Sequence, residues 1–301
     1  MAKILAVGIA TLDIVNEVNT YPDEDAEVRA LAHSVRRGGN ATNTLVVLSQ
    51  LGHSCAWAGV LVDEAAAPVI LEELARYGIR SDYCRRFPQG KLPTSYITVS
   101  RASGSRTIVH YRDLPEYDAG SFARIPLEEF DWLHFEGRNL AQALRMMRHA
   151  KQRMPTLPVS LEVEKAHDGI DRLFPFADLL LFSSSFTRQR GLEPAEIAYR
   201  ARSLAPQAAV VCSLGDRGAV GINGEGVVVT ADACHPPRVV DTLGAGDTFN
   251  AGMIDALQQG AGLQAAMRFA CALAGAKCGQ SGLHGLDIPS RNETGHGQAD
   301  V

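Results

Sequence analysis

A short stretch near the C-terminal end combines two glycines with an aspartate at the start of an apolar helix pattern. Residues 241–252 read DTLGAGDTFNAG. Glycines allow the backbone to turn tightly beside an anion, and the first amides of the helix then point unpaired N–H groups at it, along the helix dipole. Gly244, Ala245 and Gly246 therefore predict an anion-binding turn of the kind that holds a phosphate.

Asp247 ends this turn, where its carboxylate would repel a phosphate. Its presence is explained if it accepts a proton from a hydroxyl that attacks the phosphate, as a general base does. It is explained equally well as the N-cap of the following helix, a position that aspartate favours. The pattern alone leaves both roles open.

A second glycine site lies far away in the sequence and also opens a helix. Residues 37–43 read RGGNATN and lead into a helix pattern over about 41–51. Asn40 and Asn43 both fall near its first turn, where their amides can offer donors and acceptors to a polyol. An N-cap role would explain Asn40 but not Asn43. Two such sites in one chain predict a single cleft.

Short apolar runs alternate with helix patterns along most of the chain. The runs cover 4–9, 55–60, 132–135, 159–163, 179–182, 209–213 and 226–230, and the helix patterns cover 41–51, 68–77, 141–153, 248–259 and 263–278. This alternation predicts an α/β fold with a mainly parallel sheet flanked by helices on both faces. Ligands of such sheets bind beyond the carboxyl ends of the strands. Asp13 follows the first strand, where it can hold a sugar hydroxyl or only form a turn.

Two segments, 15–35 and 95–111, interrupt this alternation. In the second, strand-like residues flank Ser103-Gly104-Ser105, which predicts a hairpin. Together the segments predict a small β-sheet lid over the cleft, whose open edges would need a partner such as the lid of a second subunit. The polar, Gly-rich tail 290–301 is predicted to be disordered, which leaves 1–289 as the α/β domain.

Composition excludes several classes of partner. The chain has 301 residues, a formal net charge of −5 and 21% charged residues, so it offers no basic field for nucleic acid or anionic lipid. No apolar run is long enough to predict a membrane span. Six cysteines without Cys-x-x-Cys or zinc-ligand spacing predict reduced, mostly buried thiols. The first apolar run is followed at once by Asp13 and lacks a signal-peptide cleavage region, so we expect a cytoplasmic location. The Gly-x-Gly-x-x-Ala spelling at 260–265 follows a helix pattern instead of a strand, so we do not expect it to bind a dinucleotide.

Several segments together resemble ketohexokinase, in the ribokinase-like carbohydrate kinase family. They are GGNATN at 38–43, SGSRTI at 103–108, EGRN at 136–139, EVEK at 162–165 and the run 236–251. The resemblance extends over about 4–285. It implies a ribokinase-like fold with lid segments at about 14–37 and 91–113, a homodimer through the lid, and ATP-dependent phosphorylation of a sugar, in particular of the 1-hydroxyl of fructose or a related ketose.

The resemblance also implies roles for individual residues. Asp247 becomes the general base, and Arg106 contacts the γ-phosphate together with the turn at 244–246. The implied sugar contacts are Asp13, Gly39, Asn40, Asn43, Glu136 and Lys165, with Asp25 reaching across a dimer. The implied nucleotide contacts are Ser213, Gly215, Gly218, Cys271 and Cys278.

The implied cofactors are ATP and Mg²⁺, with a K⁺ requirement left open. The family's Asn-x-x-Glu magnesium motif is replaced here by SSSF at 183–186, so the metal ligands stay unknown, and Glu162 and Glu164 are substitutes by spacing alone. The loop SLGDRG at 213–218 is more similar to the general superfamily than to ketohexokinase. The alternatives are a kinase for another sugar, a polyol or a nucleoside, a non-catalytic regulator of the same fold, and an oxidoreductase.

Overall fold

The computed structural model describes residues 1–290 and is built on a sheet of eight strands. The strand order is β14-β13-β12-β11-β10-β9-β1-β4, and every pairing from β12 to β4 is parallel. The strands span β1 Lys3–Val7, β4 Ser54–Ala58, β9 Trp132–Glu136, β10 Val159–Val163, β11 Leu179–Phe182, β12 Ala209–Ser213, β13 Ala219–Ile222 and β14 Val228–Ala231. The central strands are buried along their whole length, as expected where both faces are covered. The predicted fold class is confirmed.

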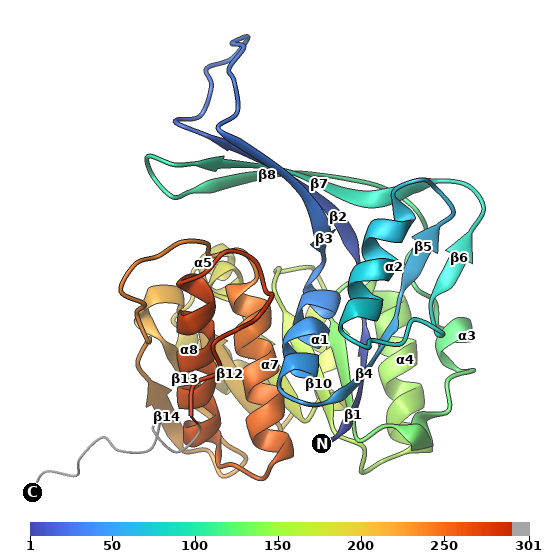
Figure 1. The fold of residues 1–301 in the computed structure, drawn as a ribbon. Coiled ribbons are helices and arrows are strands. Elements are labelled where there is room, and N and C mark those ends of the chain that lie inside the picture. The colour runs from blue at the N-terminus through green and yellow to red at the C-terminus, as the bar shows by residue number, and fades with distance from the viewer. Residues whose placement is uncertain (291–301) are drawn as a thin grey trace, which may run out of the picture.

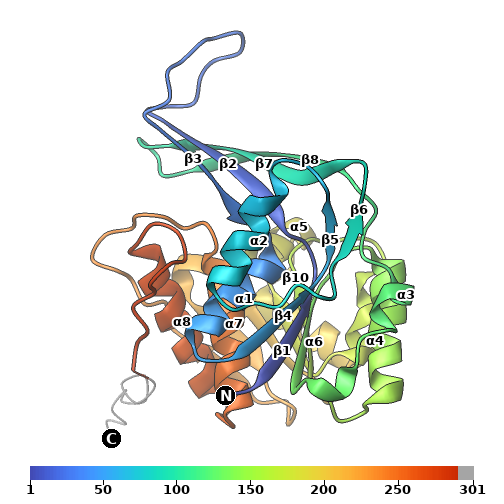
Figure 2. The same ribbon diagram turned by 45° about the vertical axis from the view of Figure 1, so that its right-hand side comes forward.

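Helices cover both faces of this sheet (Figures 1 and 2). One layer holds α1 (Asn40–Gln50), α7 (Ala245–Gln258) and α8 (Leu263–Cys278), which pack side by side. Gly252 lets α7 and α8 approach closely, because a Cβ there would lie 2.8 Å from the Ala270 Cα. The other helices are α2 Ala67–Arg76, α3 Ala119–Phe122, α4 Leu140–Arg153, α5 Ser184–Arg190 and α6 Pro194–Leu204, with short 3₁₀ helices at Leu127–Glu129, Ile170–Phe176 and Gly215–Arg217.

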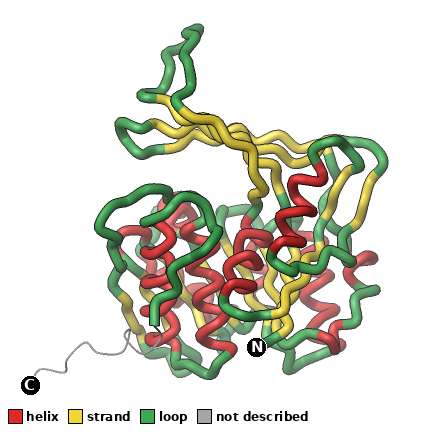
Figure 3. Tube along the Cα trace, viewed as in Figure 1, coloured by secondary structure: helices red, strands yellow, loops and turns green. Residues whose placement is uncertain are grey.

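A separate four-stranded sheet forms the lid, which runs across the top of the molecule in Figures 1 and 3. Its order is β3-β2-β7-β8, from β2 Thr11–Val18, β3 Ala32–Gly38, β7 Lys91–Ser100 and β8 Arg106–Asp113. Tyr96 pairs with Val109, so the predicted hairpin is confirmed. The small sheet predicted over the cleft is likewise present.

Some predicted elements differ from the structure. The single strand predicted over 55–60 is two strands in different sheets, because the chain turns at Gly59 and continues as β5 (Val60–Val62), which pairs with β6 (Arg85–Phe87). A Cβ on Gly59 would lie 2.3 Å from the Trp57 ring, so only glycine fits this turn. Three helices, α3, α5 and α6, and the strands β6 and β13 were not predicted.

Three sequence-based expectations concern the chain as a whole. Within residues 1–290, no helix is long and apolar enough to cross a membrane. All six cysteines are unpaired, and of these only Cys234 is exposed. The predicted disordered tail, apart from Ser290, lies outside the described residues.

Candidate active site

A cavity of about 630 Å³ lies between the lid and the carboxyl ends of the main strands. Its size suits a small-molecule site. It brings together almost all of the predicted site residues, which come from the lid, α1, α7, α8 and the loops after β10 and β12: Asp13, Gly39, Asn40, Asn43, Arg106, Lys165, Ser213, Gly215, Gly218, Gly244, Ala245, Gly246, Asp247, Cys271 and Cys278. The two predicted site residues that do not line it are Asp25 and Glu136.

The turn before α7 has the geometry of an anion-binding helix start. Gly244 is the N-cap residue and has a φ of 83°, a conformation that favours glycine. The amides of Ala245 and Thr248 donate to Thr242 and Gly244 carbonyl oxygens. Gly246 lies between them, in the first turn, where backbone N–H groups have no partner within the helix. The turn therefore presents donors to the cavity.

Asp247 lies inside the first turn of α7, so the alternative that it is the N-cap is wrong. Its side chain is buried at the bottom of the cavity, and its Oδ2 accepts a hydrogen bond of 2.7 Å from Asn43 Nδ2. Burial raises the pKa of Asp247 to about 7, although the hydrogen bond from Asn43 opposes the shift. A carboxyl group with a pKa near neutrality can accept a proton from a substrate and release it again.

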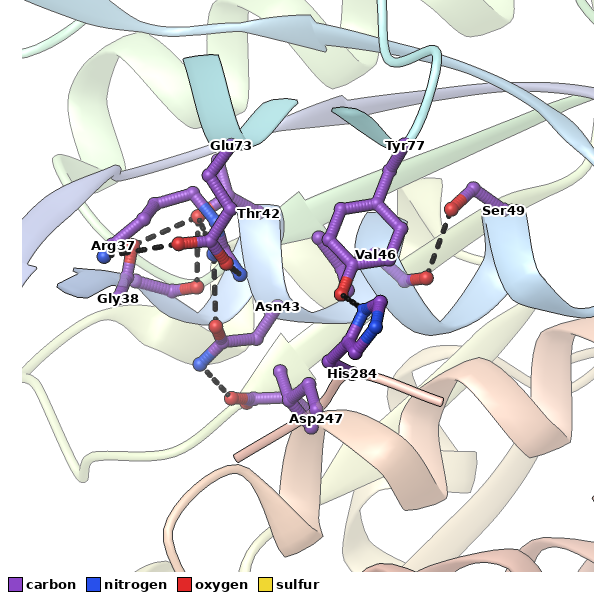
Figure 4. A network of polar contacts seen from close by, with 12 residues as sticks. Arg37, Gly38, Thr42, Asn43, Val46, Ser49, Glu73, Tyr77, Asp247 and His284 are labelled. Atoms are coloured by element: carbon purple, nitrogen blue, oxygen red, sulfur yellow. Dashed lines mark hydrogen bonds and ion pairs between the residues drawn. The ribbon is translucent and has the colours of Figure 1, made fainter. Parts of the chain in front are cut away.

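Asn40 and Asn43 lie at the start of α1, which brings them beside α7. The N-cap of α1 is Gly39, so the N-cap role considered for Asn40 is also wrong. Asn40 Nδ2 donates to Glu162 Oε1 at 3.1 Å and to Glu164 Oε2 at 3.3 Å. Asn43 joins Asp247 to Arg37, a buried residue that we did not single out in the sequence (Figure 4).

Asp13 points from the lid strand β2 into the same cavity. Its Oδ1 accepts a hydrogen bond of 2.7 Å from Thr11 Oγ1. Gly38 leaves room for it, because a Cβ on Gly38 would lie 2.0 Å from Asp13 Oδ2. A glycine is therefore needed at position 38 because the Asp13 side chain of the neighbouring strand occupies the space of a Cβ. The sequence alone could not reveal this contact.

Glu136 lies beside the main cavity, where two backbone amides bind its side chain. Its Oε1 accepts hydrogen bonds from the backbone N–H groups of Ile9, at 3.1 Å, and Ala41, at 2.6 Å. Burial raises its pKa to about 7, against the effects of Arg138 and these two amides. Glu136 lines a smaller neighbouring cavity of about 210 Å³ and joins the end of β1 to the start of α1. Asn40 and Lys165 line the same smaller cavity, so the implied sugar contact of Glu136 stays a prediction.

Asp25 lies in the exposed loop between β2 and β3, with a φ of 63°. It does not line the cavity of its own chain. Its implied role needs a second subunit and stays a prediction.

Glu162 and Glu164 project from the end of β10 into the cavity. Glu162 Oε2 is buried without a hydrogen-bond partner, and burial, with Asp247 next in effect, raises the pKa of Glu162 well above its ordinary range. Within the described residues no group of three or more His, Cys, Asp or Glu side chains is arranged to hold a metal ion. The ligands of a magnesium ion therefore stay unassigned among these residues, and its binding stays a prediction.

The lid and α8 both contact the anion-binding turn. Arg106 Nη1, on β8, donates to Thr242 Oγ1 at 2.9 Å. Lys277, fully buried at the end of α8, donates to the Asp241 carbonyl oxygen at 2.7 Å and lies 3.1 Å from Asp241 Oδ2. Asp241 Oδ1 accepts from the Leu243 amide at 2.8 Å. The sequence signalled Lys277 only as a basic residue near a helix end, so its contact with the turn was missed.

The predicted nucleotide contacts line the part of the cavity formed by α8 and the loop after β12. Gly218 has a φ of 86°, and a Cβ there would lie 2.0 Å from the Ala231 carbonyl oxygen, so this loop requires glycine. The Gly-x-Gly-x-x-Ala pattern at 260–265 follows the helix α7 and runs into the start of α8, as expected. It therefore lacks the strand that a dinucleotide-binding motif needs.

Comparisons with known proteins agree with this geometry. The sequence matches the pfkB family of carbohydrate kinases over residues 1–291. It is 38% identical to mouse ketohexokinase over 94% of this chain and 98% of the mouse protein, and 28% identical to the fructosamine kinase FrlD of Bacillus subtilis over 97% and 96%. The structure is similar to a putative ribokinase from Agrobacterium tumefaciens, with a TM-score of 0.83 and 25% identity over 97% and 96% of the two chains. The chain belongs to the pfkB family of carbohydrate kinases.

Proposed function

We propose that this kinase transfers the γ-phosphate of ATP to the 1-hydroxyl of fructose or a related ketose. The observation that carries the proposal is the position of Asp247, a buried carboxylate between the amide of Asn43 and the anion-binding turn. The identity of 38% with mouse ketohexokinase supports the choice of a ketose. An intact Asp247 argues against a non-catalytic regulator.

In the proposed reaction the sugar lies against Asp13, Asn40 and Asn43, which orient its hydroxyl toward Asp247. Asp247 accepts the hydroxyl proton as the oxygen attacks the γ-phosphorus in line. The amides of Gly246 and Asp247 and the Arg106 guanidinium donate to the phosphoryl oxygens, where charge is greatest during the transfer. Lys165, which also lines the cavity, is a further proposed sugar contact. Magnesium, bound with ATP, would neutralise phosphate charge.

An assay of ADP release over ketoses, aldoses, polyols and nucleosides tests the proposal. We expect kcat/KM for fructose to exceed that for ribose, glucose and adenosine by at least roughly tenfold, a factor that corresponds to about 1.4 kcal/mol. A higher value for ribose or adenosine would overturn the ketose assignment but leave the phosphoryl transfer in place. The same assay with and without K⁺ tests for a potassium requirement. A separate absorbance measurement with NADH tests the oxidoreductase alternative, which is excluded if the enzyme oxidises no NADH.

A second candidate acceptor is a fructosamine, because the chain is 28% identical to a fructosamine kinase. A fructosamine carries a substituted amino group in place of the 1-hydroxyl, so another of its hydroxyls would attack the γ-phosphorus. The cavity of about 210 Å³ beside Asn40 and Lys165 gives space for a larger group. Fructose and a fructosamine compared at equal concentration distinguish the two substrates. A clear preference for the fructosamine would replace fructose as the proposed acceptor.

We also propose a homodimer formed through the lid. The outer face of the lid carries exposed apolar side chains on paired strands, among them Tyr96 and Val109, which are 51% and 64% exposed. An apolar sheet face with open edges favours burial against a partner. The cytoplasmic location stays a prediction, supported by six unpaired cysteines in the described part of the chain.

A further inference from the structure

Arg37 lies at the end of the lid strand β3, directly before the two glycines that lead into α1. Its side chain is only 1% exposed, which is unusual for an arginine. It does not line the main cavity, so it is not expected to contact a substrate. A buried charge of this kind needs partners, and those partners indicate what it does.

The guanidinium of Arg37 joins three elements, as Figure 4 shows. Its Nη1 donates to Asn43 Oδ1 at 2.9 Å and to Thr42 Oγ1 at 2.8 Å, both on α1. Its Nη2 donates to Glu73 Oε1, on α2, at 3.1 Å. Glu73 Oε2 also accepts the backbone N–H of Arg37 at 3.3 Å. The guanidinium is therefore fixed on two sides.

These contacts determine which way the Asn43 amide faces. A guanidinium can only donate hydrogen bonds, so the atom of Asn43 that faces Arg37 must be the oxygen. The amide nitrogen then faces Asp247, and Nδ2 donates to Oδ2 at 2.7 Å. If the amide were turned over, its oxygen would face a carboxylate and its NH₂ group would face a guanidinium, so both contacts would be repulsive. The chain Glu73–Arg37–Asn43–Asp247 thus has one favourable arrangement.

We propose that Arg37 is a positioning residue for phosphoryl transfer: it sets the orientation of Asn43 and, through it, holds Asp247 Oδ2, which leaves Oδ1 to accept the hydroxyl proton. This inference rests on the proposed function, because it assigns Asp247 as the base. It adds a role for a residue outside the cavity.

Arg37 also acts on Asp247 through its charge. Burial contributes most to the raised pKa of Asp247, and the positive charge of Arg37 lowers that pKa. The charged groups that face Asp247 from the surrounding elements are Arg37, Asp13, Glu136, Glu162 and Glu164. Arg37 is the cation in this set. Its removal is therefore expected to raise the pKa of Asp247 and move the acidic limb of the kcat profile to higher pH.

A double-mutant cycle between Arg37→Met and Asn43→Ala tests the proposal. If Arg37 acts through Asn43, we expect Arg37→Met to lower kcat about tenfold in the wild type, a factor within the usual range for groups in contact, and to lower it little further in the Asn43→Ala variant. The sugar KM should change less than kcat. The matched control is Arg76→Met, which removes an exposed arginine of α2 and should leave kcat and its pH profile unchanged.

Arg37→Lys separates geometry from charge. Lysine keeps the positive charge but lacks the planar fork that reaches Asn43 and Glu73 together. We expect the acidic limb of the kcat–pH profile of Arg37→Lys to stay near that of the wild type, while kcat itself falls. If Arg37→Met does not fold, as judged by thermal melting, the same cycle is measured with Arg37→Lys. Losses that simply add in the double variant, or a folded Arg37 variant with unchanged kcat, would overturn the proposal.

A carboxyl ¹³C titration of Asp247 keeps this inference distinct from the proposed function. It measures the pKa of Asp247 in the wild type and in Arg37→Met without any substrate. Suppose that the pKa of Asp247 rises in Arg37→Met but the wild-type enzyme phosphorylates no sugar. This outcome would contradict only the proposed function. An unchanged pKa in an active enzyme would contradict the electrostatic role of Arg37 alone.

Discussion

At the scale of single residues, the position of Asp247 within the first turn of α7 is decisive for the site. The N-cap is Gly244, so the carboxylate is not needed to cap the helix. It is buried, and within the described part of the chain its carboxyl group receives its one side-chain hydrogen bond from Asn43. A buried carboxylate of this kind costs stability, which suggests that it is retained for its chemistry.

Asp247→Asn should abolish most of the activity. The amide is nearly the same size and can still accept the hydrogen bond from Asn43, but it cannot accept the hydroxyl proton. We expect kcat to fall on the order of 10²- to 10⁴-fold, the usual contribution of a positioned base. Steady-state kinetics and circular dichroism check this together, and a folded variant with near wild-type turnover would contradict the role.

The same variant should change how stability depends on pH. Burial raises the pKa of Asp247 from its ordinary 3.8 to about 7, so the folded state favours the protonated form. The stability that this group contributes is present below about pH 4 and is lost as the pH rises through about 7. We therefore expect Asp247→Asn to gain in Tm relative to the wild type between pH 5 and pH 8. A constant difference in Tm across this range would count against the raised pKa.

Arg106→Ala should affect turnover more than sugar binding. Arg106 contacts Thr242 at the start of the anion-binding turn, and its guanidinium is proposed to meet charge that grows during phosphoryl transfer. We expect a lower kcat with little change in the fructose KM. The control is Arg101→Ala, because Arg101 pairs with Glu17 on the lid and does not line the cavity. A rise in the fructose KM alone would make Arg106 a sugar contact.

At the scale of the elements, the anion-binding turn depends on the end of α8. The Lys277 ammonium group binds both the carbonyl and the carboxylate of Asp241, while the Cys278 carbonyl accepts the Val240 amide at 2.8 Å. Burial lowers the pKa of Lys277, and Asp241 opposes this shift. The end of one helix thus fixes the segment that leads into the next.

Lys277→Met should loosen this turn. Methionine fills a similar volume but leaves the partly buried oxygens of Asp241 without their ammonium donor, a loss of about 1–3 kcal/mol. We expect a lower Tm, a lower kcat and a higher KM for ATP, with a smaller change in the KM for fructose. Arg268→Met is the control, since it removes a cation from the same helix more than two turns away. Equal changes in both KM values would point to a general loss of structure.

At the scale of the whole molecule, the lid presents two faces with different properties. The inner face carries Asp13, Arg106 and His110 toward the cavity. The outer face carries Tyr96, Val109 and other apolar side chains that are exposed in a single chain. This division follows from the alternation of side chains along a strand, and it fits a sheet that covers a substrate on one side and a partner on the other.

Val109→Glu should therefore weaken the proposed dimer. A charge in the middle of the outer face would have to be buried on association, which is unfavourable. We expect light scattering to show a dimer for the wild type at micromolar concentration and a shift toward the monomer for the variant. Val227→Glu, on an exposed loop far from the lid, is the control. A fully active wild-type monomer would contradict the dimer and the role of Asp25 across it.

The sequence by itself determined the fold class and the type of site. Continuous apolar runs in strands such as β10 and β11, and the regular helix pattern of α8, are local signals, and their predicted bounds match the structure. The glycine-rich starts of α1 and α7 also lie in short stretches of sequence. A motif of this kind carries its backbone geometry with it, because glycine conformation and helix amides are local properties.

Only the tertiary structure decided how these parts meet. Asn43 and Asp247 are 204 residues apart, and Arg37 and Glu73 belong to different elements, so no local pattern could join them. Glu136 Oε1 accepts hydrogen bonds from the amides of Ile9 and Ala41, which are 127 and 95 residues away in the sequence. Lys277 has its partner 36 residues away. Each case depends on which buried polar groups the packed elements bring within hydrogen-bond distance, and packing fixes that for the whole chain at once.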